Sequence, residues 1–368
     1  MDFTPTEEQT AVRELAGQIF GDLSTPERLT AAGTGTDTEL WKALCTAGLP
    51  AAVGETGLLA LALALEEQGR TTAQVPFAAT CAYGVLTVAR HGTEEQRARL
   101  LPALYDGTAV ATGVLLRSSV RASGGAGGAG GAGGVRASGG VPASGGVPAS
   151  GWGRLTGTVP VVPWLRDATH VLVADEDRAL WLVPVAEARV DPVETTAPWS
   201  AGRLVLDGAG GERLGGEGAY EDVLALSRIA FTALQAGVCA GSLARAVSHT
   251  TTREQFGRPL SANQGVLLRA ADAHMDTEAI RVTAYEAAWR YDERLPCAEH
   301  ALTAAWWASE AGARVVHSGQ HLHGGIGADV DHPVHRHFLW GRQLDAHLGP
   351  GAQLLEELGD LLVGEDRA

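Results

Sequence analysis

The feature that most constrains the fold is a long, Ala-rich segment over residues 222–252, interrupted only by glycines that a helix tolerates. Two further segments with helical character follow at 263–289 and 298–319, and Pro296 separates them. A last helix is predicted over about 352–362. The C-terminal part of the chain is therefore predicted to be helical.

The first part of the chain is also predicted to be helical, whereas the middle is not. A Thr-Pro pair followed by acidic residues at 4–8 predicts a helix start, and Thr93 predicts a second one, running to about Leu101 before Pro102. The middle holds short β-branched runs at 110–115, 171–173, 180–183 and 204–206, which predict a small antiparallel β domain. A chain of 368 residues suits two or three folding units. The order helical, β, helical predicts an α+β fold, with domains at 1–105, 106–218 and 219–368.

A low-complexity tract of Gly, Ala and Ser covers residues 121–151, inside the predicted β domain. Such a sequence buries little surface and loses much backbone entropy on ordering, so it favours a flexible loop. The alternative is a glycine-rich phosphate cradle, which needs a strand before it and a helix after it. No helix pattern follows the tract, which favours the loop.

Composition narrows the class of partner and the compartment. The chain has 28 Lys and Arg against 43 Asp and Glu, a net charge of −15, so nucleic acid is not an expected partner. Its start is polar and acidic, without the pattern of a signal peptide, and its longest apolar stretch, 58–65, is too short for a membrane helix. Four cysteines are widely separated, without CxxC or zinc-ligand spacing, as expected in the reducing cytoplasm: Cys45, Cys81, Cys239 and Cys297.

One segment with chemical potential, TREQFGRPL, joins two predicted helices. Arg253 could pair with a phosphate through two hydrogen bonds, and Phe256 could stack on a planar ring. The alternative is an ordinary helix end, with Gly257 as the C-cap and Pro259 blocking continuation. The spacing alone leaves both interpretations open.

A second segment, QHLHGGIGAD, follows the helix predicted at 298–319. Its paired glycines, Gly324 and Gly325, let a backbone approach a ligand closely, although most such runs are only turns. The histidines around it invite a metal hypothesis, but there is no HExxH or CxxC pattern, and no metal is predicted. These histidines are His317, His321, His323, His332, His335 and His337.

Together these segments resemble the acyl-CoA dehydrogenase family, and the likeness covers nearly the whole chain. TREQFGRP is similar to the family's flavin-binding turn, HLHGGIG to its QxxGGxG element, and DFTPTEEQ to its N-terminal helix. DHPVHRHF resembles the branch found in actinobacterial steroid and CoA-ester catabolism. The resemblance implies an N-terminal helical domain, a central β domain and a C-terminal four-helix bundle. It also implies a tetramer that binds FAD across a subunit interface.

The resemblance also implies roles for individual residues. Arg253 should contact the FAD pyrophosphate of a neighbouring subunit, with Gln255 and Phe256 beside it and Gln264 one turn into the next helix. His321 replaces the family's usual Gln, so that an amide contact is lost there or passes to Gln320. The element that closes over the adenine and ribose maps onto His321, Gly324, Gly325 and Gly327.

The family's reaction removes an α proton from an acyl-CoA thioester with a carboxylate base, normally a Glu. The family places this Glu at one of two positions, which here hold Ser227 and Leu348-Gly349. Arg228, which follows the first position, matches the family and is implied in substrate binding. The nearest acids are Asp345, the weak candidate for the base, and Glu221.

The β domain departs from the family as well. The TEPxxGSD loop that holds the flavin ring should follow residues 112–116, but the chain reads RSSV and then the glycine tract. Where the family has a W-[IS]-T strand, this chain has Val161-Val162-Pro163-Trp164.

Three hypotheses follow from the resemblance. The first is an FAD-dependent acyl-CoA dehydrogenase in an α2β2 complex whose paralogous chain supplies the base. The second is a self-sufficient dehydrogenase, homo-oligomeric, with Asp345 as its first candidate base. The third is a scaffold or biosynthetic accessory subunit without oxidation chemistry. An electron-transferring flavoprotein is the implied electron acceptor of an active enzyme.

Overall fold

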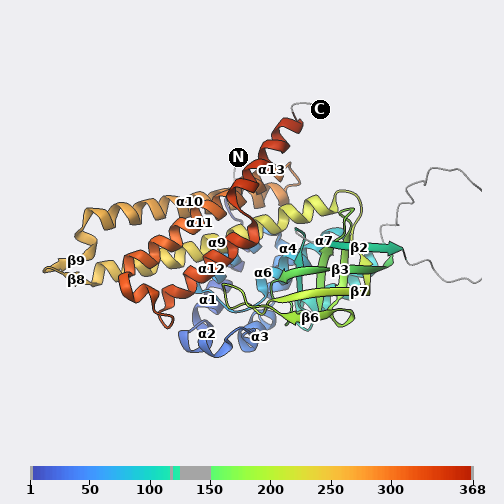
Figure 1. Cartoon of the computed structure of the whole chain (residues 1–368), viewed down its shortest axis with the longest axis horizontal. Coiled ribbons are helices and arrows are strands. Elements are labelled where there is room, and N and C mark those ends of the chain that lie inside the picture. Colours follow the sequence, from blue (N-terminus) through green and yellow to red (C-terminus); the bar gives the residue numbers. More distant parts are fainter. Residues whose placement is uncertain (1–2, 117–118, 125–150, 366–368) are drawn as a thin grey trace, which may run out of the picture.

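The structure is a computed structural model that describes residues 3–116, 119–124 and 151–365. Helices come first, a sheet follows and helices end the chain, so the predicted α+β class is confirmed. In Figure 1 the long C-terminal helices extend to the left, the sheet lies on the right, and the first helices run along the lower side. Most of the glycine-rich tract, 125–150, lies outside the described residues. Its first residues, 121–124, belong to a strand rather than to the predicted loop.

The N-terminal part is a set of helices with local capping signals. Thr6, two residues after the predicted start, accepts a hydrogen bond from the Gln9 amide at 3.2 Å and caps the first helix. Thr93 caps the last one as predicted, but this helix continues through Pro102 to Tyr105, beyond the predicted end at Leu101. The helices are α1 (Glu7–Leu23), α2 (Pro26–Ala32), α3 (Thr38–Thr46), α4 (Leu49–Thr56), α5 (Leu58–Thr71), α6 (Phe77–Ala79), the π-helical η1 (Thr80–Leu86), α7 (Thr87–His91) and α8 (Glu94–Tyr105).

Seven strands of the described chain form one sheet, in the order β1-β4-β5-β7-β3-β2, with β6 paired to β7. The predicted sheet was antiparallel throughout, but β1 pairs with β4 in parallel. A long connection separates these two strands in sequence, which is what a parallel pair requires. The strands are β1 (Ala111–Val114), β2 (Ser119–Gly124), β3 (Trp152–Val162), β4 (His170–Ala174), β5 (Leu180–Pro184), β6 (Arg189–Pro192) and β7 (Gly202–Arg213), with the short 3-10 turn η2 (Val185–Glu187) between β5 and β6.

Four of the C-terminal helices pack into a bundle, and a fifth follows it. We did not predict α12 from the sequence, although Pro333 at its start is a helix-start signal, because its buried face includes His337, Gly341 and Gln343, which do not count as apolar residues. The helices are α9 (Ala219–Thr252), α10 (Gln264–Asp292), α11 (Ala298–His323), α12 (Pro333–Leu348) and α13 (Gly351–Glu365). Between them lie β8 (Glu254–Gln255), β9 (Arg258–Pro259), and the 3-10 turns η3 (Leu260–Ala262) and η4 (Gly324–Ala328).

The N-terminal helices and the bundle share one core along α5 and α9. A side chain at Gly69 would collide with the backbone of Leu234, and one at Gly237 with the backbone of Glu66, so these glycines let the two helices cross closely. By length and composition α9 alone among the described helices could cross a membrane, but 94% of its most apolar window is buried inside the protein.

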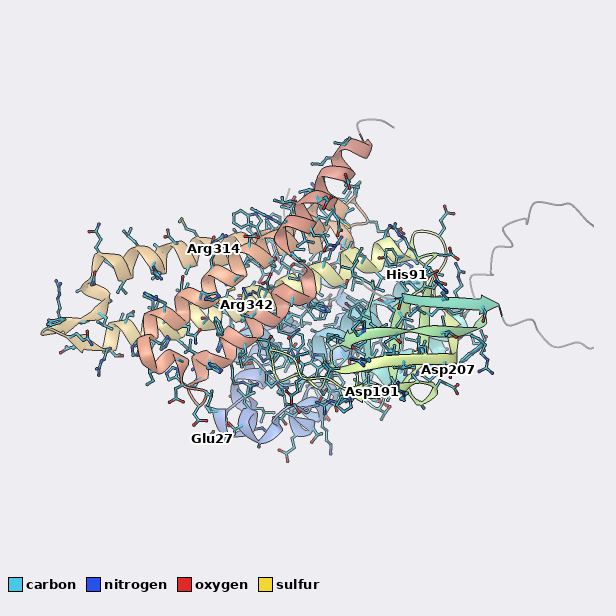
Figure 2. The ribbon with its side chains drawn as sticks, viewed as in Figure 1. Glu27, His91, Asp191, Asp207, Arg314 and Arg342 are labelled. Atoms are coloured by element: carbon cyan, nitrogen blue, oxygen red, sulfur yellow. The ribbon has the colours of Figure 1, made fainter. Side chains whose placement is uncertain are left out.

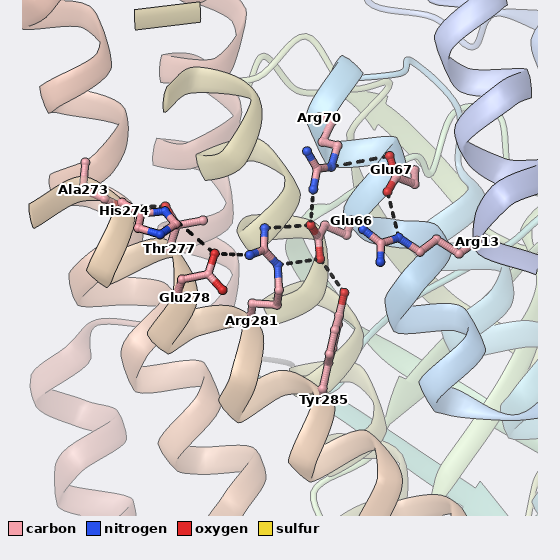
Figure 3. Close-up of polar contacts among 10 residues, drawn as sticks. All are labelled: Arg13, Glu66, Glu67, Arg70, Ala273, His274, Thr277, Glu278, Arg281 and Tyr285. Carbon is pink, nitrogen blue, oxygen red and sulfur yellow. Dashed lines mark hydrogen bonds and ion pairs between the residues drawn. The ribbon is translucent and has the colours of Figure 1, made fainter. Parts of the chain in front are cut away.

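A buried ion-pair network joins α5 to α10 (Figure 3). The side chain of Glu66 is 0% exposed, and its two oxygens accept hydrogen bonds from Arg281 at 2.8 and 3.0 Å. Arg70 and the hydroxyl of Tyr285 bond to the same carboxylate. Burial alone would raise the pKa of Glu66, but the bonds from Arg281 and Tyr285 hold this pKa below its usual value. The charged carboxylate thus fixes the N-terminal helices against the bundle.

Candidate active site

Two adjoining cavities lie between the sheet, the first turns of α9 and the C-terminal end of α12. The larger has a volume of about 480 Å³, within the range of small-molecule sites. Its walls come from β1, β3, the loop before Ala197 and the last turn of α12. They include Val114, Leu116, Val159, Pro160, Val161, Pro163, Glu194, Thr195, Thr196, Gln343, Ala346, His347 and Gly349. Val114, Leu116 and His347 also line the smaller cavity, so His347 stands between the two.

The two expected base positions meet at these cavities. Ser227 and Leu348 both line the smaller cavity, and Gly349 lines the larger one. The hydroxyl of Ser227 donates a hydrogen bond to the carbonyl oxygen of Leu224 at 2.9 Å. The sequence pattern therefore identified two positions that the fold brings together, and neither carries a carboxylate.

Three ring side chains narrow the smaller cavity, which has a volume of only about 30 Å³. The rings of Phe231 and His347 are 4.2 Å apart between centroids, and those of Tyr83 and Phe231 are 6.0 Å apart. Burial lowers the pKa of His347 to about 4, and burial raises the pKa of Tyr83. Both side chains are thus neutral near pH 7 and add no charge to the walls of this cavity.

The candidate acids do not reach the smaller cavity. Asp345 accepts a hydrogen bond from Ser309 at 2.7 Å and pairs at 3.3 Å with Arg342, which is labelled in Figure 2, and it lines neither cavity. Glu221 pairs with exposed Arg178 at 3.2 Å.

Of two polar residues that line the cavities, Arg228 was expected from the family resemblance and Glu194 was not. Glu194 lines the larger cavity, but its loop has no motif that could have marked it. Arg228, the implied substrate-binding residue, lines the smaller cavity and pairs with Glu357 of α13. Within the described chain its guanidinium is thus already neutralised.

The TREQFGRP segment forms a hairpin at the far end of the bundle from the sheet (Figure 1). Arg253 ends α9, and Phe256 and Gly257 form the turn between β8 and β9 with φ angles of +53° and +75°. Gly257 is thus a hairpin residue rather than the expected helix C-cap. Phe256 is fully exposed, and Gln255 and Gln264 are exposed as well. Among the described residues no side chain pairs with the Arg253 guanidinium.

The glycine turn, which we define as Gly324–Ala328, lies at this same end of the bundle. His249, in the last turn of α9, stacks on His323, which directly precedes the turn, with 4.8 Å between ring centroids. A side chain built on Gly324 or Gly325 would meet nothing within 4 Å, so their backbone is open, whereas Gly327 is buried. His321 is exposed.

The amide of Gln320 is already used within this turn. It donates to the carbonyl oxygen of Gly327 at 3.1 Å and so holds the turn closed. No group of three or more His, Cys, Asp or Glu side chains in the described chain has the geometry of a metal site.

The cavities and the bundle end are separated by the length of α12. This helix has 16 residues, and at a rise of about 1.5 Å per residue it spans roughly 24 Å. The Trp164 side chain, at the place of the family's W-[IS]-T strand, does not line either cavity but stacks on buried Trp199 at 5.9 Å.

Comparisons with known proteins agree with this geometry. The family model for the acyl-CoA dehydrogenase N-terminal domain matches residues 6–108, and the model for the C-terminal domain matches residues 215–359. The chain is 33% identical to acyl-CoA dehydrogenase FadE27 of Mycobacterium tuberculosis, over 98% of both proteins.

Two solved structures are similar over nearly their full length. The Tcur3481-Tcur3483 steroid ACAD has a TM-score of 0.85 and 37% identity, covering 98% of this chain and 99% of that one. The ChsE4-ChsE5 complex from Mycobacterium tuberculosis has a TM-score of 0.85 and 30% identity, covering 99% of each chain. The chain therefore belongs to the acyl-CoA dehydrogenase family, whose members are FAD-dependent oxidoreductases that act on CH-CH groups.

Proposed function

We propose that this chain is one subunit of a heteromeric acyl-CoA dehydrogenase, a heterotetramer in which a paralogous chain supplies the carboxylate base. The observation that carries the proposal is the small cavity at the two base positions. Its volume of about 30 Å³ has room for only a few water molecules, so by itself it does not hold an acyl chain. Ser227 and Leu348 stand where the family places its Glu.

The side chains around this cavity cannot replace the missing base. Bound FAD would accept a hydride from the β carbon of the acyl thioester, and a base must take the α proton. The Ser227 hydroxyl is bonded to a backbone carbonyl, and Leu348 has no polar group. A pKa of about 4 makes His347 a weak base. No side chain of the smaller cavity can therefore act as the base, and we assign the base to another chain.

The far end of the bundle fits the pyrophosphate and adenosine part of FAD. Arg253 offers an exposed guanidinium without a partner among the described residues, which suits a charge-assisted bond to phosphate. Phe256 offers an exposed ring, and Gly324 and Gly325 offer open backbone. The glycine turn lies roughly 24 Å of α12 away from this chain's own cavities, and Arg253 lies roughly 39 Å of α9 away from Ser227. We therefore assign these groups to a flavin whose ring lies in the partner.

The outer side of the bundle supports a subunit interface. A groove of about 470 Å³ runs between α9 and α10, with Ala240, Ala244 and Val247 among its lining residues. Large apolar side chains of α9 and α10 are about half exposed, and an exposed apolar surface of this kind marks interaction sites. They are Val247, Leu267, Leu268, Met275 and Val282.

The comparisons support both a paralogous partner chain and a steroid-type substrate. Two of the similar structures carry two chain names each, ChsE4-ChsE5 and Tcur3481-Tcur3483, and the second is described as a steroid ACAD. We therefore propose a paralogous partner, a steroid-type acyl-CoA thioester as substrate, an electron-transferring flavoprotein as acceptor, and the cytoplasm as location.

The test is to purify this chain alone and together with a co-expressed paralogue that carries Glu at either base position. Flavin content is read from visible absorbance, and dehydrogenation is followed with an artificial electron acceptor. We expect activity only from the complex. Replacing the partner's Glu by Gln should abolish this activity, while Asp345→Asn in this chain, the matched control, should leave it unchanged.

Each other outcome selects one of the alternatives. Activity of the chain alone, lost in Asp345→Asn, would show a self-sufficient enzyme. A complex that contains flavin only in the partner and keeps full activity when this chain carries Arg253→Ala would show a scaffold. Either result contradicts the proposal.

A further inference from the structure

Three histidines from three separate elements meet at the bundle end. His249 lies in the last turn of α9, His323 ends α11, and His332 immediately precedes α12. The ring centroids of His249 and His323 are 4.8 Å apart with planes at 24°, and those of His323 and His332 are 5.0 Å apart at 62°. We call these three side chains the histidine stack. It joins α9 to both helices that flank the glycine turn.

The hydrogen bonds that His323 and His332 make depend on which of their ring nitrogens carry a proton. Nδ1 of His323 lies 2.7 Å from the carbonyl oxygen of Gly319, so this nitrogen carries a proton and donates it. Nδ1 of His332 accepts a hydrogen bond from the Val334 amide at 3.3 Å and caps α12. An accepting nitrogen carries no proton, so His332 is neutral with its proton on Nε2. A proton added to Nδ1 of His332 removes the cap.

The charges that face the histidine stack also favour neutral rings. Burial, then His323 and Arg253, lower the pKa of His249. Burial, then His323, Arg245 and His249, lower the pKa of His332, and only Asp329 opposes them. Both arginines belong to α9, and the nearby titratable residues of α12 add no negative charge: His335, Arg336 and His337.

We propose that the histidine stack is a proton-operated latch: its neutral rings hold the glycine turn and the start of α12 against α9, and protonation releases this end of the bundle. Two charged imidazoles in contact repel each other, and Arg245 and Arg253 repel both. The added proton also removes the cap of α12. Because Arg253 and Gly324 are the proposed FAD contacts, release would weaken cofactor binding; this consequence rests on the proposed function, whereas the latch does not.

The direction of the pH dependence follows from the opened state. When the bundle end opens, water surrounds the rings of His249 and His332, and their lowered pKa values return towards about 6.5. The opened state then binds protons at a higher pH than the closed state, so acid favours opening. Each unit of pKa difference raises the opening equilibrium by up to about tenfold per histidine.

The test is hydrogen exchange of the purified chain at about pH 7.5 and about pH 5.5, corrected for the chemical exchange rate. Peptides covering 319–335 should lose protection at the lower pH, while peptides of α5 should not. The double variant His249→Phe and His332→Asn should lose this pH dependence, because Phe keeps a ring and Asn keeps an N-cap acceptor. His274→Asn, the matched control at an exposed position on α10, should keep the wild-type dependence.

Two results would overturn the latch. One is constant protection of 319–335 between the two pH values in the wild-type chain, and the other is the same pH dependence in the double variant. If the double variant does not fold, the same hydrogen-exchange measurement on the single variant His332→Asn replaces it, and we expect a weaker pH dependence of protection at 319–335 than in the wild-type chain. The measurement needs neither FAD nor a partner. A negative result would therefore contradict the latch but not the proposed function, and evidence against the proposed function would not contradict the latch.

Discussion

The two ends of α12 have opposite characters. At its C-terminal end the side chains of Phe231 and His347 narrow a cavity against the sheet, and Arg228, which also lines this cavity, is neutralised by Glu357. At its N-terminal end Arg253 has no partner among the described residues, and Phe256 is fully exposed. An exposed ring and an unpaired guanidinium stabilise nothing within the chain. The comparison therefore separates groups that hold this subunit together from groups available to a second one.

The two phenylalanines give the largest expected contrast. Phe231 is 1% exposed, so Phe231→Ala should lower the free energy of unfolding by about 3–5 kcal/mol, because it removes buried surface and leaves a cavity. Phe256 is fully exposed, so Phe256→Ala should change it by less than about 0.5 kcal/mol. Urea unfolding of both variants measures the difference. Equal losses would show that the hairpin packs in solution and would remove the contrast.

The pH dependence at the closed end is the next largest effect. Burial lowers the pKa of His347 to about 4, so the folded chain keeps this ring neutral while the unfolded chain protonates near pH 6.5. Stability should therefore fall as the pH drops from about 6.5 to 4, by up to about 3 kcal/mol from this residue.

The matched variant isolates the contribution of this ring. His347→Phe keeps an aromatic side chain but cannot take up a proton, so its stability should vary less with pH in this window, as measured by urea unfolding at several pH values. His274→Asn, at an exposed position, should behave as the wild type does. A wild-type slope in His347→Phe would place the acid sensitivity in other groups, of which His337, whose pKa burial also lowers to about 4, is the first to examine.

At the open end, Arg253→Ala should reduce FAD affinity of the heteromeric complex. A charge-assisted hydrogen bond to phosphate contributes about 1.5–3 kcal/mol, which corresponds to a roughly 10- to 100-fold increase in the Kd for FAD. Arg203→Ala, which removes an exposed arginine from β7, is the control and should not change this Kd. Flavin released on dilution, followed by fluorescence, measures both. An unchanged Kd in Arg253→Ala would assign the open end to something other than the cofactor.

Much of the helical part could be predicted from sequence, because long apolar periods and caps such as Thr93 are local signals. The two base positions could be placed only through the family resemblance, and the structure brings Ser227 and Leu348 to the same cavity. We missed α12 because two positions of its regularly spaced buried face are held by His337 and Gly341 rather than by apolar residues. We missed the parallel pair of β1 with β4 because pairing direction is set by the whole topology.

The site's most informative feature, the closed cavity, could not be predicted at all. Tyr83, Phe231 and His347 come from three distant segments, and only packing decides that their rings meet. Glu194 was missed for the same reason, since its loop carries no motif and reaches the larger cavity through the fold of the sheet. His323 and His332 belong to the group of histidines noted in the sequence, whereas His249 lies in a separate segment, and only the structure shows that the three rings stack.

The smallest expected effect concerns the two glycines of the open end. Gly324 has a φ of +66°, where a side chain is strained, so Gly324→Ala should lower the free energy of unfolding by about 1 kcal/mol. Gly325 has no such strain and no neighbour within 4 Å of an added Cβ, so Gly325→Ala should leave stability within about 0.5 kcal/mol of wild type. If the open backbone is a cofactor contact, the same methyl group should still weaken FAD binding to the complex, because it occupies the space that the ligand needs. Loss of FAD without loss of stability in Gly325→Ala is a result that a purely structural turn cannot produce, and unchanged FAD binding would assign this glycine to the turn alone.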